Sequence, residues 1–77
     1  MNVNRKDWQA LVKGLLKSEL KRRGLGYADL AEKLQAVGVN DNERNISNKI
    51  ARGTFTAIFF VQCLTAIGRK VIRLEED

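Results

Sequence analysis

The chain has 77 residues, of which 44% are hydrophobic and 30% are charged, with six glycines and no proline. This composition excludes a disordered or fibrous chain and favours one small globular domain of helices and short turns, because helix breakers are scarce. With a single cysteine, Cys63, and no histidine, the chain excludes an internal disulfide and a zinc site of the usual kind, so we expect no metal and no cofactor.

The first predicted helix spans residues 5–23. Asn4 is a suitable N-cap with Asp7 three positions later, and Gly24 provides a left-handed end. Gly14 costs about 1 kcal/mol relative to alanine inside a helix, so we expect another helix to approach closely there. The apolar stripe of this helix recurs every three or four residues and consists of Trp8, Leu11, Val12, Leu15, Leu16 and Leu20.

Two shorter helices are predicted next, over residues 27–38 and about 43–52. The first of them ends at Gly38, and its buried stripe consists of Leu30, Ala31, Leu34 and Val37. The second ends at Gly53. Its candidate caps are Asn40, Asp41 and Asn42, and Asn40 with Glu43 fits the spacing of a capping box.

The segment "TFTAIFFVQCLTAIG" contains residues that favour strands, but it runs for about 12 residues without a turn signal, which is long for a strand. We predict a central buried helix that begins at Thr54 or Thr56 and ends before Gly68. The tail "RKVIRLEED" is predicted to be extended, and its apolar part "VIRL" suits strand pairing within the chain or in a homodimer. The predicted fold is therefore a mostly α, compact bundle of four helices in one domain, residues 1–77, with a short extended C-terminal tail.

The positive charge is concentrated at the start of the chain. Residues 1–24 carry seven basic and two acidic side chains, whereas residues 25–77 carry seven of each. Lys13, Lys17 and Lys21 are spaced four residues apart and so form one basic row beside the apolar stripe. Three interpretations stay open for this row: a solvated helix face, a set of phosphate contacts, or a surface for an acidic partner or a membrane surface.

The predicted third helix has an outward face rich in hydrogen-bonding side chains. With Ile46 and Ile50 facing inward, the outward residues are those that read base edges in the DNA major groove: arginine pairs with guanine and asparagine with adenine. They are Arg44, Asn45, Asn48 and Arg52, with Ser47 and Lys49 on the flanks and Lys49 suited to a phosphate. The alternative is an ordinary solvated helix face.

The order of these elements resembles the lambda-repressor-like helix-turn-helix family over roughly residues 8–68. The resemblance is carried by "LAEKL", "IARG" and "LTAIG", that is, by Leu30, Ala31, Ile50, Arg52, Gly53, Leu64 and Gly68. The chain also looks like the small uncharacterised bacterial domains built on this pattern. Its connection "AVGVNDNE" is longer than the usual turn of three or four residues. The resemblance implies a recognition helix over about 43–52.

From these features we expect a cytoplasmic DNA-binding domain of a bacterial or phage-type transcriptional regulator, with double-stranded DNA as its partner. The alternative is a protein-interaction or homodimerisation module that keeps the helix-turn-helix architecture without DNA. With neither histidine nor a glycine-rich phosphate loop, we expect no catalytic residue, no enzyme activity and no small-molecule substrate. The longest apolar run, "AIFFV", is too short to span a membrane, and the N-terminus lacks the features of a signal peptide.

Overall fold

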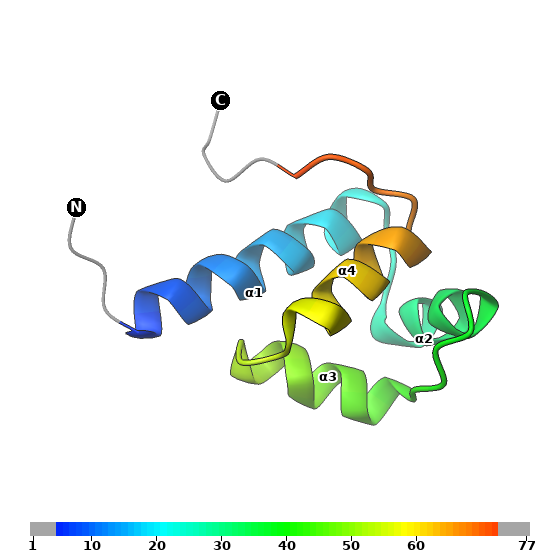
Figure 1. Ribbon diagram of the computed structural model, residues 1–77, viewed down its shortest axis with the longest axis horizontal. Coiled ribbons are helices and arrows are strands. Elements are labelled where there is room, and N and C mark those ends of the chain that lie inside the picture. Colours follow the sequence, from blue (N-terminus) through cyan, green and yellow to red (C-terminus); the bar gives the residue numbers. More distant parts are fainter. Residues whose placement is uncertain (1–4, 73–77) are drawn as a thin grey trace.

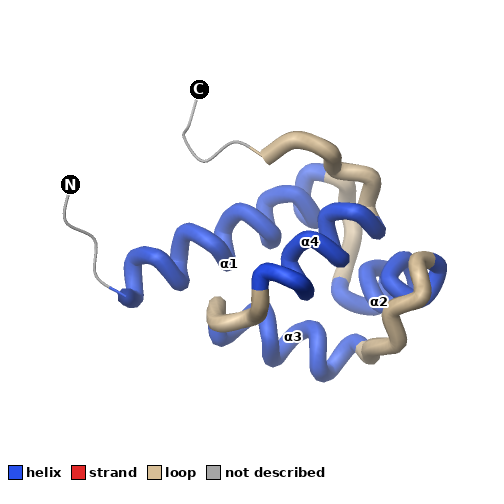
Figure 2. Tube along the Cα trace, in the orientation of Figure 1, coloured by secondary structure: helices blue, strands red, loops and turns tan. Residues whose placement is uncertain are grey.

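Four helices arranged around one small core make up the described part of the chain (Figure 1). The structure is a computed structural model that describes the backbone of residues 5–72 and the side chains of residues 7–72. No strand occurs within residues 5–72, as Figure 2 shows, which confirms the predicted all-helical fold class. The helices are α1 (Arg5–Arg22), α2 (Tyr27–Ala36), α3 (Glu43–Arg52) and α4 (Ala57–Ala66).

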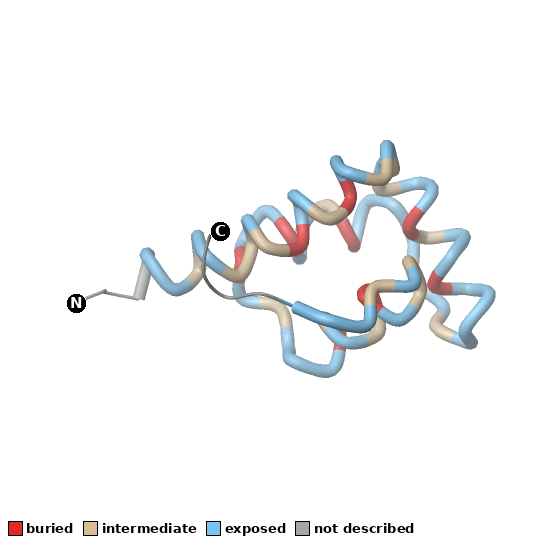
Figure 3. The backbone as a smooth tube through the Cα atoms, turned by 90° about the horizontal axis from the view of Figure 1, so that it is seen from above, coloured by how far each residue is buried: buried red, intermediate tan, exposed pale blue. Residues whose placement is uncertain are grey.

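The core is formed where α2 packs against α3 and α4 and where α1 packs against α3. Every helix contributes, which is what so short a chain requires if it is to bury enough apolar surface. In Figure 3 the buried positions lie along the inner sides of the helices. The buried side chains are Leu16, Leu20, Leu30, Leu34, Ile46, Ile50, Phe59, Cys63 and Leu64.

The apolar stripe of α1 is buried only over its C-terminal half. Leu16 and Leu20 are buried, whereas Trp8 is 57% exposed and Leu11 39% exposed. At about 1.5 Å per residue, α1 with its 18 residues is almost twice as long as α3, the ten-residue helix that it packs against. Its first turns therefore extend beyond the core (Figure 1), and Trp8 and Leu11 of the predicted apolar stripe are exposed.

The other helices also differ from prediction at their ends. The α2 helix ends at Ala36 instead of reaching residue 38, and Val37 is its exposed C-cap rather than part of the buried stripe. The α4 helix is buried on one side only, since Ile58 is 70% exposed. Residues 69–72 form no strand, while Asn4 and the tail beyond Ile72 lie outside the described residues.

Side-chain caps fix where α3 and α4 begin. Asn42, not Asn40, caps α3: its Oδ1 accepts a hydrogen bond from the backbone N–H of Asn45 at 2.8 Å. Thr56 caps α4 in the same way, because its Oγ1 accepts from the N–H of Phe59 at 3.0 Å. Each cap satisfies an N–H group that has no partner within its own helix.

The close backbone approach occurs at Gly53 and not at Gly14. Gly53 ends α3 in the left-handed conformation with φ of 66°, and a Cβ atom there would lie only 2.8 Å from the backbone oxygen of Gln9 on α1. A Cβ atom at Gly14 would meet no atom within 4 Å. The expectation of a close approach at Gly14 is therefore wrong, and the contact between α1 and α3 requires glycine at the end of α3.

Gly14→Ala is expected to stabilise the protein by about 1 kcal/mol, because alanine loses less backbone entropy in a helix and the added methyl group points into open space. Chemical denaturation followed by circular dichroism measures the change. A lower free energy of unfolding would contradict the open environment of this residue.

Gly53→Ala is expected to destabilise the protein by at least about 2 kcal/mol, through left-handed strain and collision with the Gln9 carbonyl group. Gly38→Ala is the matched control, because Gly38 has φ of 85° but a Cβ atom there meets nothing within 4 Å. Gly38→Ala introduces the left-handed backbone strain without the collision, so its free energy of unfolding should fall by about half as much as that of Gly53→Ala. Equal losses in the two variants would exclude the proposed contact with α1.

Candidate nucleic-acid interface

The outer side of α3 presents a row of three exposed polar side chains. Ile46 and Ile50 are fully buried, which turns Arg44, Asn48 and Arg52 toward solvent. These three residues are four apart in sequence and therefore lie one above the other along the helix. Within the part of the chain that the structure describes, none of the three makes a hydrogen bond or an ion pair. The row is consequently available to bind another molecule.

Two other predicted site residues, Asn45 and Lys49, lie beside Asp41 on the flank of α3. The Lys49 ammonium group donates to Oδ2 of Asp41 at 2.7 Å, and its Nζ also lies 4.7 Å from the centre of the Phe59 ring. The Asn45 side chain is exposed, and its polar interaction with Asp41 helps to lower the pKa of that carboxyl group. The Lys49 contacts join α3 to α4 and to the segment before α3, so the Lys49 side chain has a structural role.

Asp41 is the acceptor around which the connection between α2 and α3 is organised. Its side chain is only 8% exposed, and its Oδ1 accepts the backbone N–H of Asn42 at 2.9 Å. Burial alone raises the pKa of this carboxyl group, but hydrogen bonds from Lys49 and from the Asn42 backbone outweigh it, and the pKa lies below its ordinary value of 3.8. Sequence reasoning treated Asp41 only as a possible helix cap, because its main partner is eight residues away.

The predicted basic row on α1 is divided into two parts. Lys13 is half-buried, and its Nζ donates to the backbone oxygen of Ala51 at 3.2 Å. Ala51 lies near the C-terminal end of α3, where the helix dipole favours a cation. Lys17 and Lys21 are exposed and line an open cavity of about 460 Å³ together with Leu25 and Tyr27 at the start of α2. Only Lys17 and Lys21 therefore remain exposed for phosphate contacts. The remaining predicted residue, Ser47, is half-buried on the flank of α3.

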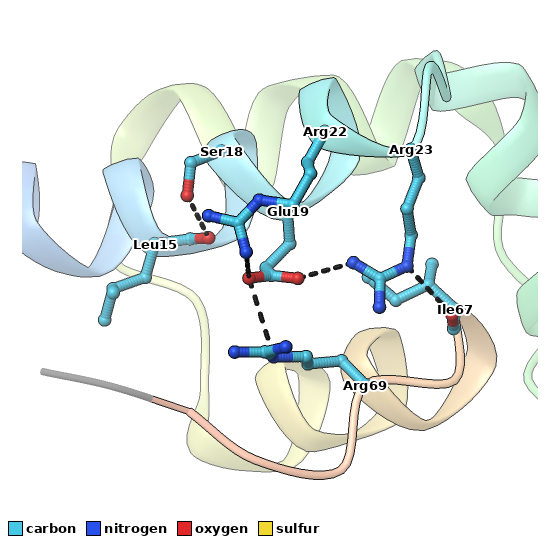
Figure 4. A network of polar contacts seen from close by, with 7 residues as sticks. All are labelled: Leu15, Ser18, Glu19, Arg22, Arg23, Ile67 and Arg69. Carbon is cyan, nitrogen blue, oxygen red and sulfur yellow. Dashed lines mark hydrogen bonds and ion pairs between the residues drawn. The ribbon is translucent and has the colours of Figure 1, made fainter. Parts of the chain in front are cut away.

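The carboxylate of Glu19 forms ion pairs with three arginines, and this network was not identified from the sequence. Its Oε1 lies 3.4 Å from Nη1 of Arg22 and 3.6 Å from Nε of Arg69, and its Oε2 accepts from Arg23 (Figure 4). Arg23 also donates through Nε to the backbone oxygen of Ile67 at 3.2 Å. This network fastens the segment after α4 to the end of α1, and it partly neutralises three of the basic side chains.

The described residues contain neither a metal-binding cluster nor a membrane-spanning helix. No three side chains of the histidine, cysteine, aspartate or glutamate type lie close enough there to hold a metal ion. None of the four helices is long and apolar enough to cross a membrane. Cys63 is buried in the core, and this burial raises the pKa of its thiol to about 12.

Asp41→Asn is expected to lower the free energy of unfolding by about 1 kcal/mol at neutral pH, because a charge-assisted hydrogen bond to Lys49 is lost. The pKa of Asp41 is lowered in the folded state, so its stabilisation is present above pH 3.8 and is lost as the pH falls through the lower folded pKa. Denaturation of both proteins between neutral and acidic pH measures the difference. A difference that stays constant down to the lowest pH would contradict an ionised Asp41.

Comparison with known proteins gives a family but no relative of known activity. No curated protein matches the chain, and no solved structure matches it. The matched region, residues 8–72, begins at Trp8 on α1 and ends at Ile72, so it contains all of α2, α3 and α4 and most of α1. Over this region the chain belongs to the family described as a domain of unknown function (DUF6471).

Proposed function

We propose that this chain binds double-stranded DNA through α3, as the recognition helix of a helix-turn-helix in a bacterial or phage-type transcriptional regulator. The observation that carries this proposal is the exposed row of Arg44, Asn48 and Arg52, which makes no hydrogen bond or ion pair within the described part of the chain. Two guanidinium groups and one amide, aligned on one side of a short helix, are side chains suited to base edges and phosphates.

The dimensions of α3 suit a major groove. An α-helix with its side chains is about 10–12 Å in diameter, which fits a groove about 12 Å wide, and the row from Arg44 to Arg52 extends about 12 Å along the helix axis. Arginine binds guanine in bidentate fashion and asparagine binds adenine in the same way. Because the three side chains make no hydrogen bond or ion pair with another described residue, DNA contact would require no rearrangement of the described fold.

The contacts around α3 support different roles for individual members of the predicted set of DNA-binding residues. We assign base contacts to Arg44, Asn48 and Arg52, and phosphate contacts to the exposed Lys17 and Lys21. Lys49 and Lys13 instead hold α3 against the rest of the protein, through Asp41 and the Ala51 carbonyl oxygen respectively. In this proposal Asn45 and Ser47 lie at the edge of the interface.

Asn48→Ala is expected to change stability and DNA affinity in opposite directions. Alanine is the better helix former at an exposed position, so the free energy of unfolding should rise by about 0.5 kcal/mol. Affinity for a duplex selected from random sequences should fall by about tenfold, because the amide pair with a base is lost. Denaturation and fluorescence anisotropy of labelled DNA measure the two quantities. Unchanged affinity would contradict the proposed docking of α3.

Arg44→Ala and Arg52→Ala should each weaken binding to the selected duplex by about tenfold. Lys33→Ala is the control, because it removes the same charge from an exposed residue on α2, outside α1 and α3. Affinity should also fall steeply with salt concentration for the unmodified protein. If the control weakens binding as much as the two arginine variants do, the interaction is non-specific attraction to a basic protein and the recognition role of α3 is excluded.

A further inference from the structure

The outer side of α4 is apolar and has no partner in the described part of the chain. Ile58 is 70% exposed and Val61 58% exposed, although α4 buries Phe59, Cys63 and Leu64 on its inner side. Ile58, Val61 and Thr65 are separated by three and four residues and so share one face of the helix. Contiguous exposed apolar side chains of this kind mark interaction sites more often than isolated ones do.

This apolar face continues onto the segment that follows α4. Val61, Leu64, Thr65 and Ile72 line an open groove of about 430 Å³, and Ile72 is 41% exposed. The segment turns back beside α4 after Ala66, where the backbone N–H of Arg69 donates to the oxygen of Leu64 at 2.8 Å. Because Arg69 is also paired with Glu19 on α1, the groove wall is fastened to the bundle (Figure 4).

The charge distribution indicates what this face can bind. The α4 helix contains no charged residue in a chain that is 30% charged, whereas Lys17, Lys21, Arg44 and Arg52 are exposed on α1 and α3. The α4 helix itself has no lysine or arginine that could bind a phosphate-rich partner. Of the residues that line the groove, Arg69 and Lys70 are charged, and Arg69 is paired with Glu19. Two copies of this protein, each with a net charge of +5, therefore meet with less repulsion along α4 than along α1 or α3.

We infer that a second copy of this chain packs on the outer face of α4, with the two α4 helices related by a twofold axis. Such an interface is isologous, so Ile58 and Val61 of one copy cover the same patch of the other. Ile58 and Val61 are the most exposed apolar side chains of this face, and so few contacts make a weak dimer whose population depends on protein concentration.

Sedimentation equilibrium over a hundredfold range of protein concentration tests this inference. The unmodified chain should shift from monomer to dimer, and Val61→Lys should weaken the association at least tenfold, since it places two like charges near the axis. Val37→Lys is the matched control, because Val37 is also an exposed valine but is the C-cap of α2 and does not line the groove, and this variant should associate like the unmodified chain. A monomer at every concentration, or equal effects of both substitutions, would overturn the inference.

Disulfide cross-linking provides a second test of the inference in case Val61→Lys disturbs folding. Val61→Cys should form a disulfide-linked dimer under mild oxidation, because the two copies of residue 61 lie near the twofold axis, and Val37→Cys should not. The native Cys63 is fully buried and is not expected to react. Cross-linking of both variants at the same rate would indicate random collision and would also overturn the inference. No DNA is present in either experiment, so their failure would leave the proposal for α3 unaffected.

Discussion

The structure depends on how α3, a helix of ten residues with only two buried side chains, is held in place. Ile46 and Ile50 provide its apolar anchor, which is small for a helix that must keep a fixed orientation. Polar contacts reinforce it at both ends: Lys49 binds Asp41 near the start, and Lys13 binds the Ala51 carbonyl oxygen near the end. All of these contacts use the inner side and flanks of α3. Its outer row is thereby left without a hydrogen-bond or ion-pair partner among residues 7–72.

The sequence was sufficient to predict features that depend on local periodicity. The inward isoleucines of α3 and its left-handed end at Gly53 follow from the spacing of residues within one helix. The extent to which α1 is buried does not follow from this spacing, because a helical stripe indicates which side faces the core and not how far the core extends. That limit is set by the shorter helices packed beside α1. The sequence predicted a close helix approach at Gly14, because that glycine is unusual within its own helix. The steric constraint instead involves Gly53 and the backbone of Gln9, which are 44 residues apart in the sequence.

Long-range polar contacts were also beyond sequence reasoning, and they change how the net charge is interpreted. The concentration of basic residues at the start of the chain suggested one continuous basic row on α1. In the structure Glu19 pairs with Arg22 and Arg23, which follow it by three and four residues, and with the distant Arg69, while Lys13 binds the end of α3. These partners weaken the field of the cations that they bind. Exposed cations without such a partner lie on α1, α2 and α3 and at Lys70, so the positive charge is not confined to one row on α1.

The two proposed surfaces use different sides of the bundle and place a condition on each other. Base contacts would come from the outer row of α3, and self-association from Ile58 and Val61 on α4, so no residue serves both. The two helices are linked through Lys49, which binds Asp41 and lies over the Phe59 ring on the inner side of α4. A dimer about α4 would therefore carry two α3 helices in a fixed relation to one twofold axis. DNA read by such a dimer must contain two half-sites with the same symmetry, and the α4 contact would determine their spacing.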